Sequence, residues 1–181
     1  MSSPAQMFVF VSDRLACVKI VGRANFTTSI DFKMLINELD RQGYKCYVLD
    51  LSECMLMDST FLGVMAGMAL KFGGGQTCNG REHVIELLNA NERNIESLET
   101  LGVLHLFKVV KGSDRLPTEL TDRGAAPITL HSREEVTQNC LEAHKLLMDI
   151  CPANISKFKE VTQFLAENLK KLKPEGQEGR G

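Results

Sequence analysis

The fold of this chain is decided by residues 48–64, which read VLDLSECMLMDSTFLGV. An apolar run over 47–51 shows no polar alternation before Asp50, which predicts a strand buried on both faces of a sheet. From Ser59 onward apolar residues recur at helical spacing, and the glycines at 73–75 end that pattern. The helical stripe consists of Leu62, Met65, Ala69 and Phe72. A buried strand therefore leads through a short loop into a helix over 59–72.

Strands and helices alternate on both sides of this stretch. Before it, apolar runs over 7–11 and 15–21 predict a hairpin of two strands, and residues 29–42 carry apolar side chains on one helical face. After it, strands are predicted over 83–88 and 106–110, with a helix over 91–101 between them. The predicted order is β, β, α, β, α, β, α, β. The fold class is therefore α/β: a mixed, mostly parallel β-sheet with helices packed against it.

The pattern changes after residue 112. Residues 113–133 are predicted as a linker, because prolines and a glycine punctuate a polar stretch without sustained apolar periodicity. Two helical stripes within 134–172 then predict an αα-hairpin, with Asn154 suited to cap its second helix. We thus expect one domain over 1–112, the C-terminal hairpin, and a disordered tail over 173–181. So short a helix pair must pack on the domain, on a second copy or on another protein.

Composition and charge exclude several classes of function. The formal net charge of −2 gives no electrostatic reason to expect nucleic acid or an anionic membrane as a partner. The longest nearly uncharged apolar run, 61–70, is about half of what a bilayer crossing needs. Residues 1–6 lack the basic start and long apolar stretch of a signal peptide, so a cytoplasmic location is expected.

Metal and cofactor chemistry is not expected either. The six cysteines show no CxxC spacing, which favours reduced, packed thiols over metal or disulfide roles. The four histidines lie far apart in the sequence and form no HExxH motif. The sequence neighbours of Ser59 offer no general base, so we expect no nucleophilic catalysis and no enzyme.

The segment around Ser59 suits an anion. Asp58 can cap the helix, which leaves Ser59 and Thr60 in the first turn, where the dipole is positive. A phosphate on Ser59 would add charge beside unpaired N–H groups without unfolding the domain, and a partner docked on that surface would meet it. Asp-Ser-Thr is also a common capping sequence, so a purely structural role stays open.

Two segments of the chain resemble the signature of STAS domains of the anti-sigma factor antagonist, or anti-anti-sigma factor, family. In that family a buried strand runs through a short loop into Asp-Ser-Ser/Thr-Gly-Leu-Gly at a helix start, and Asp58-Ser59-Thr60-Phe61-Leu62-Gly63 fills the same place here. Residues 92–110 resemble the family's last helix, glycine and final strand. The likeness covers 7–112 and leaves out the C-terminal hairpin. Phe61 stands where the family usually has glycine, which bears on how closely a kinase approaches.

The resemblance implies a partner-switching regulator of transcription. Ser59, or less favourably Thr60, would be the phosphoacceptor. An anti-sigma factor serine kinase would bind the unmodified form and phosphorylate it, and a PP2C-type phosphatase would reset it. The implied switch-loop and partner-binding residues are Asp58, Met57, Thr60, Phe61, Leu62 and Gly63.

A second hypothesis stays open beside the switch. In it the chain is a phosphorylation-independent STAS scaffold or accessory subunit of an assembly, lipid or transport complex. It would act through the C-terminal hairpin, which could also form a homodimer.

Overall fold

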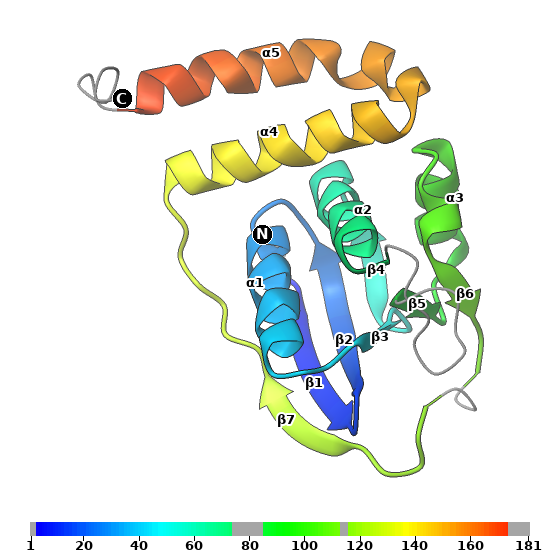
Figure 1. Ribbon diagram of the computed structural model, residues 1–181. Coiled ribbons are helices and arrows are strands. Elements are labelled where there is room, and N and C mark those ends of the chain that lie inside the picture. Colours follow the sequence, from blue (N-terminus) through cyan, green and yellow to red (C-terminus); the bar gives the residue numbers. More distant parts are fainter. Residues whose placement is uncertain (1–2, 74–84, 113–115, 174–181) are drawn as a thin grey trace.

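A single mixed sheet runs through the centre of the computed structural model, which describes residues 3–73, 85–112 and 116–173 (Figure 1). Within those residues the sheet has seven strands in the order β6-β5-β3-β2-β1-β7, and β4 pairs with β2 off this path. The strands are β1 Gln6–Ser12, β2 Leu15–Ala24, β3 Cys46–Asp50, β4 Cys54–Met57, β5 Ile85–Leu88, β6 Lys108–Val110 and β7 Thr121–Ala125.

The pairing of the strands confirms the predicted class of sheet. β1 is antiparallel to both β2 and β7, whereas the pairs β2–β3, β3–β5, β5–β6 and β2–β4 are parallel. β3 lies between two parallel neighbours, and its residues Val48 and Leu49 are fully buried. The apolar run over 47–51 therefore forms the doubly buried central strand that its composition predicts.

The helices lie on one face of the sheet. They are α1 Thr28–Arg41, α2 Ser59–Gly73, α3 Glu92–Thr100, α4 Arg133–Ile150 and α5 Ile155–Leu172, with short 3₁₀ turns at Leu104–Leu106 and Pro152–Asn154. Alternate strand residues such as Val18 and Leu49 join the main core under the helices. Their neighbours Cys17 and Val48 belong to a smaller cluster on the other side of the sheet. This alternation is the period-2 geometry of a strand.

The C-terminal hairpin packs on the domain. Figure 1 shows α4 crossing over α2, with α5 outside α4. Ala143 and Leu147 of α4 belong to the same core cluster as the sheet residues, and Leu147 is fully buried. The sequence allowed the hairpin to pack on the domain, on a second copy or on another protein. In the structure it packs on the domain of its own chain.

The sequence pattern does not predict two of the strands. β7 lies within the segment predicted as a linker, and its exposed, polar residues carry no strand pattern. It exists because β1 offers an open edge, to which Thr121–Ala125 pairs. β4 is only four residues long and lies in the loop predicted before the helix. The division into domain, linker and hairpin stays a prediction.

Some sequence predictions fall partly on residues that are not described. Glycines 74–75, residues 83–84 of the strand predicted over 83–88, Cys78 and the tail beyond Lys173 lie outside the described residues. Cys17, Cys54, Cys140 and Cys151 are free thiols, as expected, but Cys46 is disulfide-bonded and differs from that expectation. Within the described ranges, no helix could cross a membrane and no cluster of three or more metal-ligating side chains occurs.

Candidate functional site

Asp58 fixes the start of α2. Its amide donates to the carbonyl of Ala24 at 3.0 Å, which continues the pairing of β4 with β2. Its carboxylate then accepts two backbone N–H groups, from Phe61 at 2.8 Å and from Phe26 at 2.7 Å. The first bond caps α2, as the sequence predicts, and the second ties α2 to the loop before α1. Burial raises the pKa of Asp58, and the bonds from Phe61 and Phe26 oppose that rise.

Ser59 is the first residue of α2 and is half-buried. Its side chain lines a groove of about 500 Å³ between α2, α3 and α5. Arg93 of α3 and Lys157 of α5 line the same groove. A hydroxyl at the first position of a helix thus opens on a space that also contains two cationic side chains.

The hydroxyl of Ser59 is held by a histidine from the C-terminal hairpin. The distance from Ser59 Oγ to His144 Nε2 is 3.0 Å, and His144 Nδ1 lies 2.8 Å from the carbonyl oxygen of Cys140. A carbonyl oxygen only accepts, so Nδ1 carries the proton and Nε2 accepts the hydroxyl of Ser59. Burial lowers the pKa of His144, which keeps the imidazole neutral at neutral pH.

This contact corrects one sequence prediction. We expected no general base within reach of Ser59, but His144 is in hydrogen-bond contact with it from 85 positions along the chain. The neighbours of Ser59 in sequence include no histidine, and no local pattern links a serine to a histidine on another helix. The one available signal was that His144 follows Cys140 by one helical turn within the hairpin predicted over 134–172.

A serine bonded to a histidine also raises the question of acyl transfer. That chemistry needs backbone donors free to bind a developing oxyanion near the serine. Here the carboxylate of Asp58 lies against the amides of Thr60 and Phe61. An oxyanion at this position would face a carboxylate, so the geometry favours a structural contact between Ser59 and His144 over a nucleophile and its base.

The other predicted switch-loop residues are almost fully buried. Met57, Thr60, Phe61 and Leu62 are each at most 3% exposed. Phe61, which replaces the family's usual glycine, packs its ring 5.0 Å from that of Phe32 on α1. The hydroxyl of Thr60 contacts the sulfur of Cys140 at 3.7 Å. Only Asp58 and Ser59 of the predicted set are partly open to solvent, and whether the set binds a partner stays a prediction.

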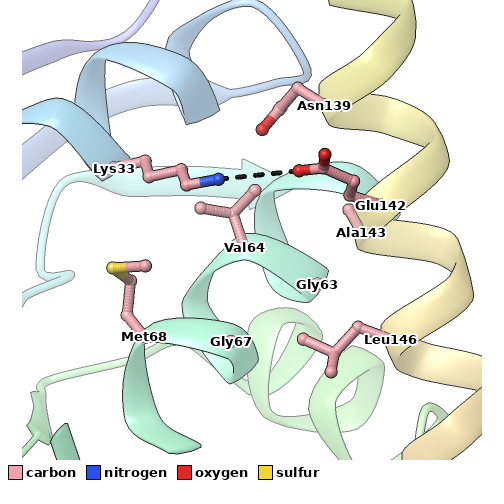
Figure 2. Close-up of a pocket in the computed structure, with 9 residues that line it drawn as sticks. All are labelled: Lys33, Gly63, Val64, Gly67, Met68, Asn139, Glu142, Ala143 and Leu146. Carbon is pink, nitrogen blue, oxygen red and sulfur yellow. Dashed lines mark ion pairs between the residues drawn. The ribbon is translucent and has the colours of Figure 1, made fainter. Parts of the chain in front are cut away.

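Helix α4 covers these residues by approaching α2 closely. A Cβ on Gly63 would lie 2.8 Å from the carbonyl oxygen of Ala143, and one on Gly67 would lie 3.0 Å from Leu146. Figure 2 shows both glycines facing α4, with Lys33 of α1 paired to Glu142 of α4 at 3.7 Å above them. The missing side chains at Gly63 and Gly67 are what allow the two helices to pack here.

Buried polar side chains hold the hairpin at several further points. Asn139 of α4 donates to the hydroxyl of Ser29 at 2.8 Å. Asn154 occupies the N-cap position of α5, as predicted, but its side chain does not cap the helix. It is fully buried and donates to the carbonyls of Leu101 and Leu147 at 2.9 and 2.8 Å. The prediction of its side-chain role was wrong because Asn154 joins the hairpin to the domain.

The segment that leads into α4 is also fixed to the domain. Asp31 in the first turn of α1 pairs with His131 at 2.8 Å, and both side chains are buried. Ser132 and Glu135 then form a capping box that starts α4. The direction of α4 across α2 is therefore set before its first turn.

Comparisons with known proteins bear on the fold. No protein-family model and no curated protein sequence matches the chain. Among solved structures, the anti-sigma factor antagonist SpoIIAA in its unphosphorylated form matches with a TM-score of 0.50 and 14% identity, over 60% of this chain and 89% of that one. A candidate anti-sigma factor antagonist from Thermotoga maritima, tm1081, gives a TM-score of 0.49 and 19% identity, over 59% and 86%. The STAS-like fold expected from the sequence is confirmed.

Proposed function

We propose that this protein is an anti-sigma factor antagonist controlled by phosphorylation of Ser59. In its unmodified form it binds an anti-sigma factor serine kinase, and in its phosphorylated form it releases that kinase. The observation that carries the proposal is the position of Ser59: a half-buried hydroxyl at the first residue of α2, open to a groove. The fold that the chain shares with SpoIIAA supports the general role.

Phosphorylation at this position is physically reasonable. The kinase would transfer the γ-phosphoryl group of a nucleoside triphosphate to Ser59 Oγ, with loss of the hydroxyl proton and release of the diphosphate. The product carries about −1.5 to −2 charges. Asp58 already accepts the amide of Phe61, so a phosphate here would be stabilised by the helix dipole and by the cations Arg93 and Lys157 that line the groove.

Ser59 is a better acceptor than Thr60. Thr60 is only 3% exposed, and its hydroxyl lies against Cys140 under α4. Ser59 lines the groove and can meet an approaching nucleotide once the hairpin moves. We infer that Ser59 is the phosphoacceptor and that Asp58 and Gly63 belong to the surface that the kinase reads.

The remaining parts of the pathway follow from this role. A PP2C-type phosphatase would return the protein to its unmodified form, and the output would be transcription through a released or captured sigma factor. Such signalling takes place in the cytoplasm, and the protein itself would regulate without catalysing a reaction.

The scaffold hypothesis finds less support. It needs the hairpin to offer its apolar stripe to another molecule, but Ala143, Leu147 and Leu169 are buried within this chain. Phe164 of α5, which is 63% exposed, is the most exposed aromatic side chain among the described residues. A homodimer through the hairpin would therefore rest on the outer face of α5 alone.

Intact mass spectrometry after co-expression with the cognate serine kinase tests the proposal. We expect one added phosphate, assigned by fragmentation to Ser59. The Ser59→Ala variant should gain none, and Thr60→Val should gain the same phosphate as the unmodified sequence. An unshifted mass, or a phosphate on another residue, would contradict the proposal.

A further inference from the structure

The groove beside Ser59 is lined by more cationic than anionic side chains. Its lining comes from α2, α3 and α5 and from the end of β4. The lining residues are Met57, Ser59, Leu62, Arg93, Glu96, Ser97, Thr100, Leu101 and Lys157. Two of these side chains are cations and one, Glu96, is an anion.

The two cations have N–H donors that make no hydrogen bond to another described residue. Arg93 is exposed, and its guanidinium, which has five N–H donors, makes no hydrogen bond or ion pair within the described part of the chain. Lys157 is exposed and donates to the carbonyl of Thr100 at 3.2 Å, which uses one of its three N–H groups. Both groups can therefore turn toward an anion that enters the groove.

The two cations also belong to different parts of the molecule. Arg93 lies on α3 of the domain, and Lys157 lies on the first turns of α5 in the hairpin. His144, the third group that can face Ser59, lies on α4. An anion bound by all three would join the hairpin to the domain.

We propose that a phosphate on Ser59 is bound by the chain's own Arg93, Lys157 and His144, and that this contact latches the C-terminal hairpin over α2. The inference rests on the proposed function in one respect, since a kinase must add the phosphate. It goes further by naming the groups that bind the phosphate and the state that they stabilise.

The latch replaces a weak contact with stronger ones. In the unmodified protein the groove side of the hairpin is held at Ser59 by one neutral hydrogen bond, to His144. A phosphate dianion there favours protonation of the imidazole, so that Nε2 donates in place of accepting. Bonds between ionised groups are roughly twice as strong as neutral ones. Asp58 and Glu96 oppose the phosphate, and the three cationic groups outweigh them.

The latch explains how a phosphate could release a partner without touching it. Thr60 and Gly63 lie against Cys140 and Ala143 of α4, so a partner reaches them only when the hairpin moves away. A phosphate that holds α4 in place keeps that surface covered. The unmodified protein, with the neutral bond alone at this point, opens more readily.

Phosphorus NMR of the full chain, with phosphoserine incorporated at position 59 during translation, tests the binding groups. An unperturbed phosphoserine has a second pKa of about 6. We expect the cations to lower that pKa by roughly one unit. The double variant Arg93→Gln with Lys157→Gln should bring it back toward the ordinary value. Lys159→Gln is the matched control, because Lys159 is exposed on the same helix and does not line the groove.

Hydrogen exchange on the same proteins tests the latch. Amides of α4 and α5 should exchange several-fold more slowly in the phosphorylated chain than in the unmodified chain, and the double variant should lose that difference. An ordinary phosphoserine pKa, faster exchange on phosphorylation, or unfolding of the phosphorylated chain would each overturn the proposal. Because the phosphate is added without a kinase, these results are independent of whether a kinase modifies Ser59.

Discussion

At the scale of single residues, the local pattern around Ser59 was predictable and its partner was not. Capping is a local property, so Asp58 and Ser59 could be placed at a helix start from sequence alone. The bond from Ser59 to His144 joins residues 85 positions apart and depends on where α4 lies. Spacing in a sequence carries no information on such a contact.

Replacement of Asp58 tests its two bonds. Asp58→Ala leaves the amides of Phe61 and Phe26 without their acceptor, and we expect a loss of about 1–2 kcal/mol in the free energy of unfolding. Asp58→Asn keeps an acceptor oxygen and should lose less. Urea denaturation followed by circular dichroism measures both. Equal stability of the alanine variant and the unmodified sequence would contradict the assigned role.

His144 predicts a dependence of stability on pH. Burial lowers the pKa of His144 in the folded chain below its ordinary value of 6.5, so the unfolded chain takes up the proton first as the pH falls. Stability from His144 is therefore fully present above pH 6.5 and is lost as the pH falls through its folded pKa. Denaturation series at pH 7.5 and 5.5 should show a smaller loss in His144→Gln than in the unmodified sequence. An equal loss in both would contradict the assignment.

At the scale of elements, the predicted helices and buried strands were found, and the elements that depend on a neighbour were missed. β3 and α2 carry their own apolar patterns. β7 has no apolar pattern, because only its backbone is used, in pairing with β1. The close approach of α4 to α2 likewise depends on two residues without side chains, whose meaning appears only when the facing helix is known.

Gly63→Ala tests that approach. The new Cβ would lie 2.8 Å from the carbonyl oxygen of Ala143, so α4 must shift outward. We expect a loss of about 1–3 kcal/mol in the free energy of unfolding and faster hydrogen exchange in α4. Gly73→Ala, on the same helix with nothing within 4 Å, is the matched control and should not destabilise the protein. Equal exchange in both variants would show that α4 does not rest on Gly63.

At the scale of the whole molecule, the sequence suggested a domain and a separate hairpin, and the structure shows a shared core. Leu147 is fully buried in the same cluster as Val18 and Leu49 of the sheet. The polar composition of 113–133 predicted a domain boundary. Polar composition indicates that a segment is exposed to solvent, and the strand β7 is exposed just as a linker would be. A shared core predicts that the domain and the hairpin unfold together in one cooperative transition.

Leu147→Ala addresses that question. The substitution removes a side chain with no exposure, and we expect it to cost about 2–5 kcal/mol. Because the core is shared, far-ultraviolet circular dichroism should show one unfolding transition with a lower midpoint for the whole chain. Two transitions, with the sheet unaffected, would show that the hairpin is an independent domain.

Calorimetric titration of the cognate serine kinase with the full chain, unmodified or carrying phosphoserine at position 59, tests the switch at Ser59 most directly. We expect the phosphorylated chain to bind roughly 10–100-fold more weakly, with Ser59→Ala still able to bind. Equal affinity of the two forms for the kinase would contradict a switch at Ser59.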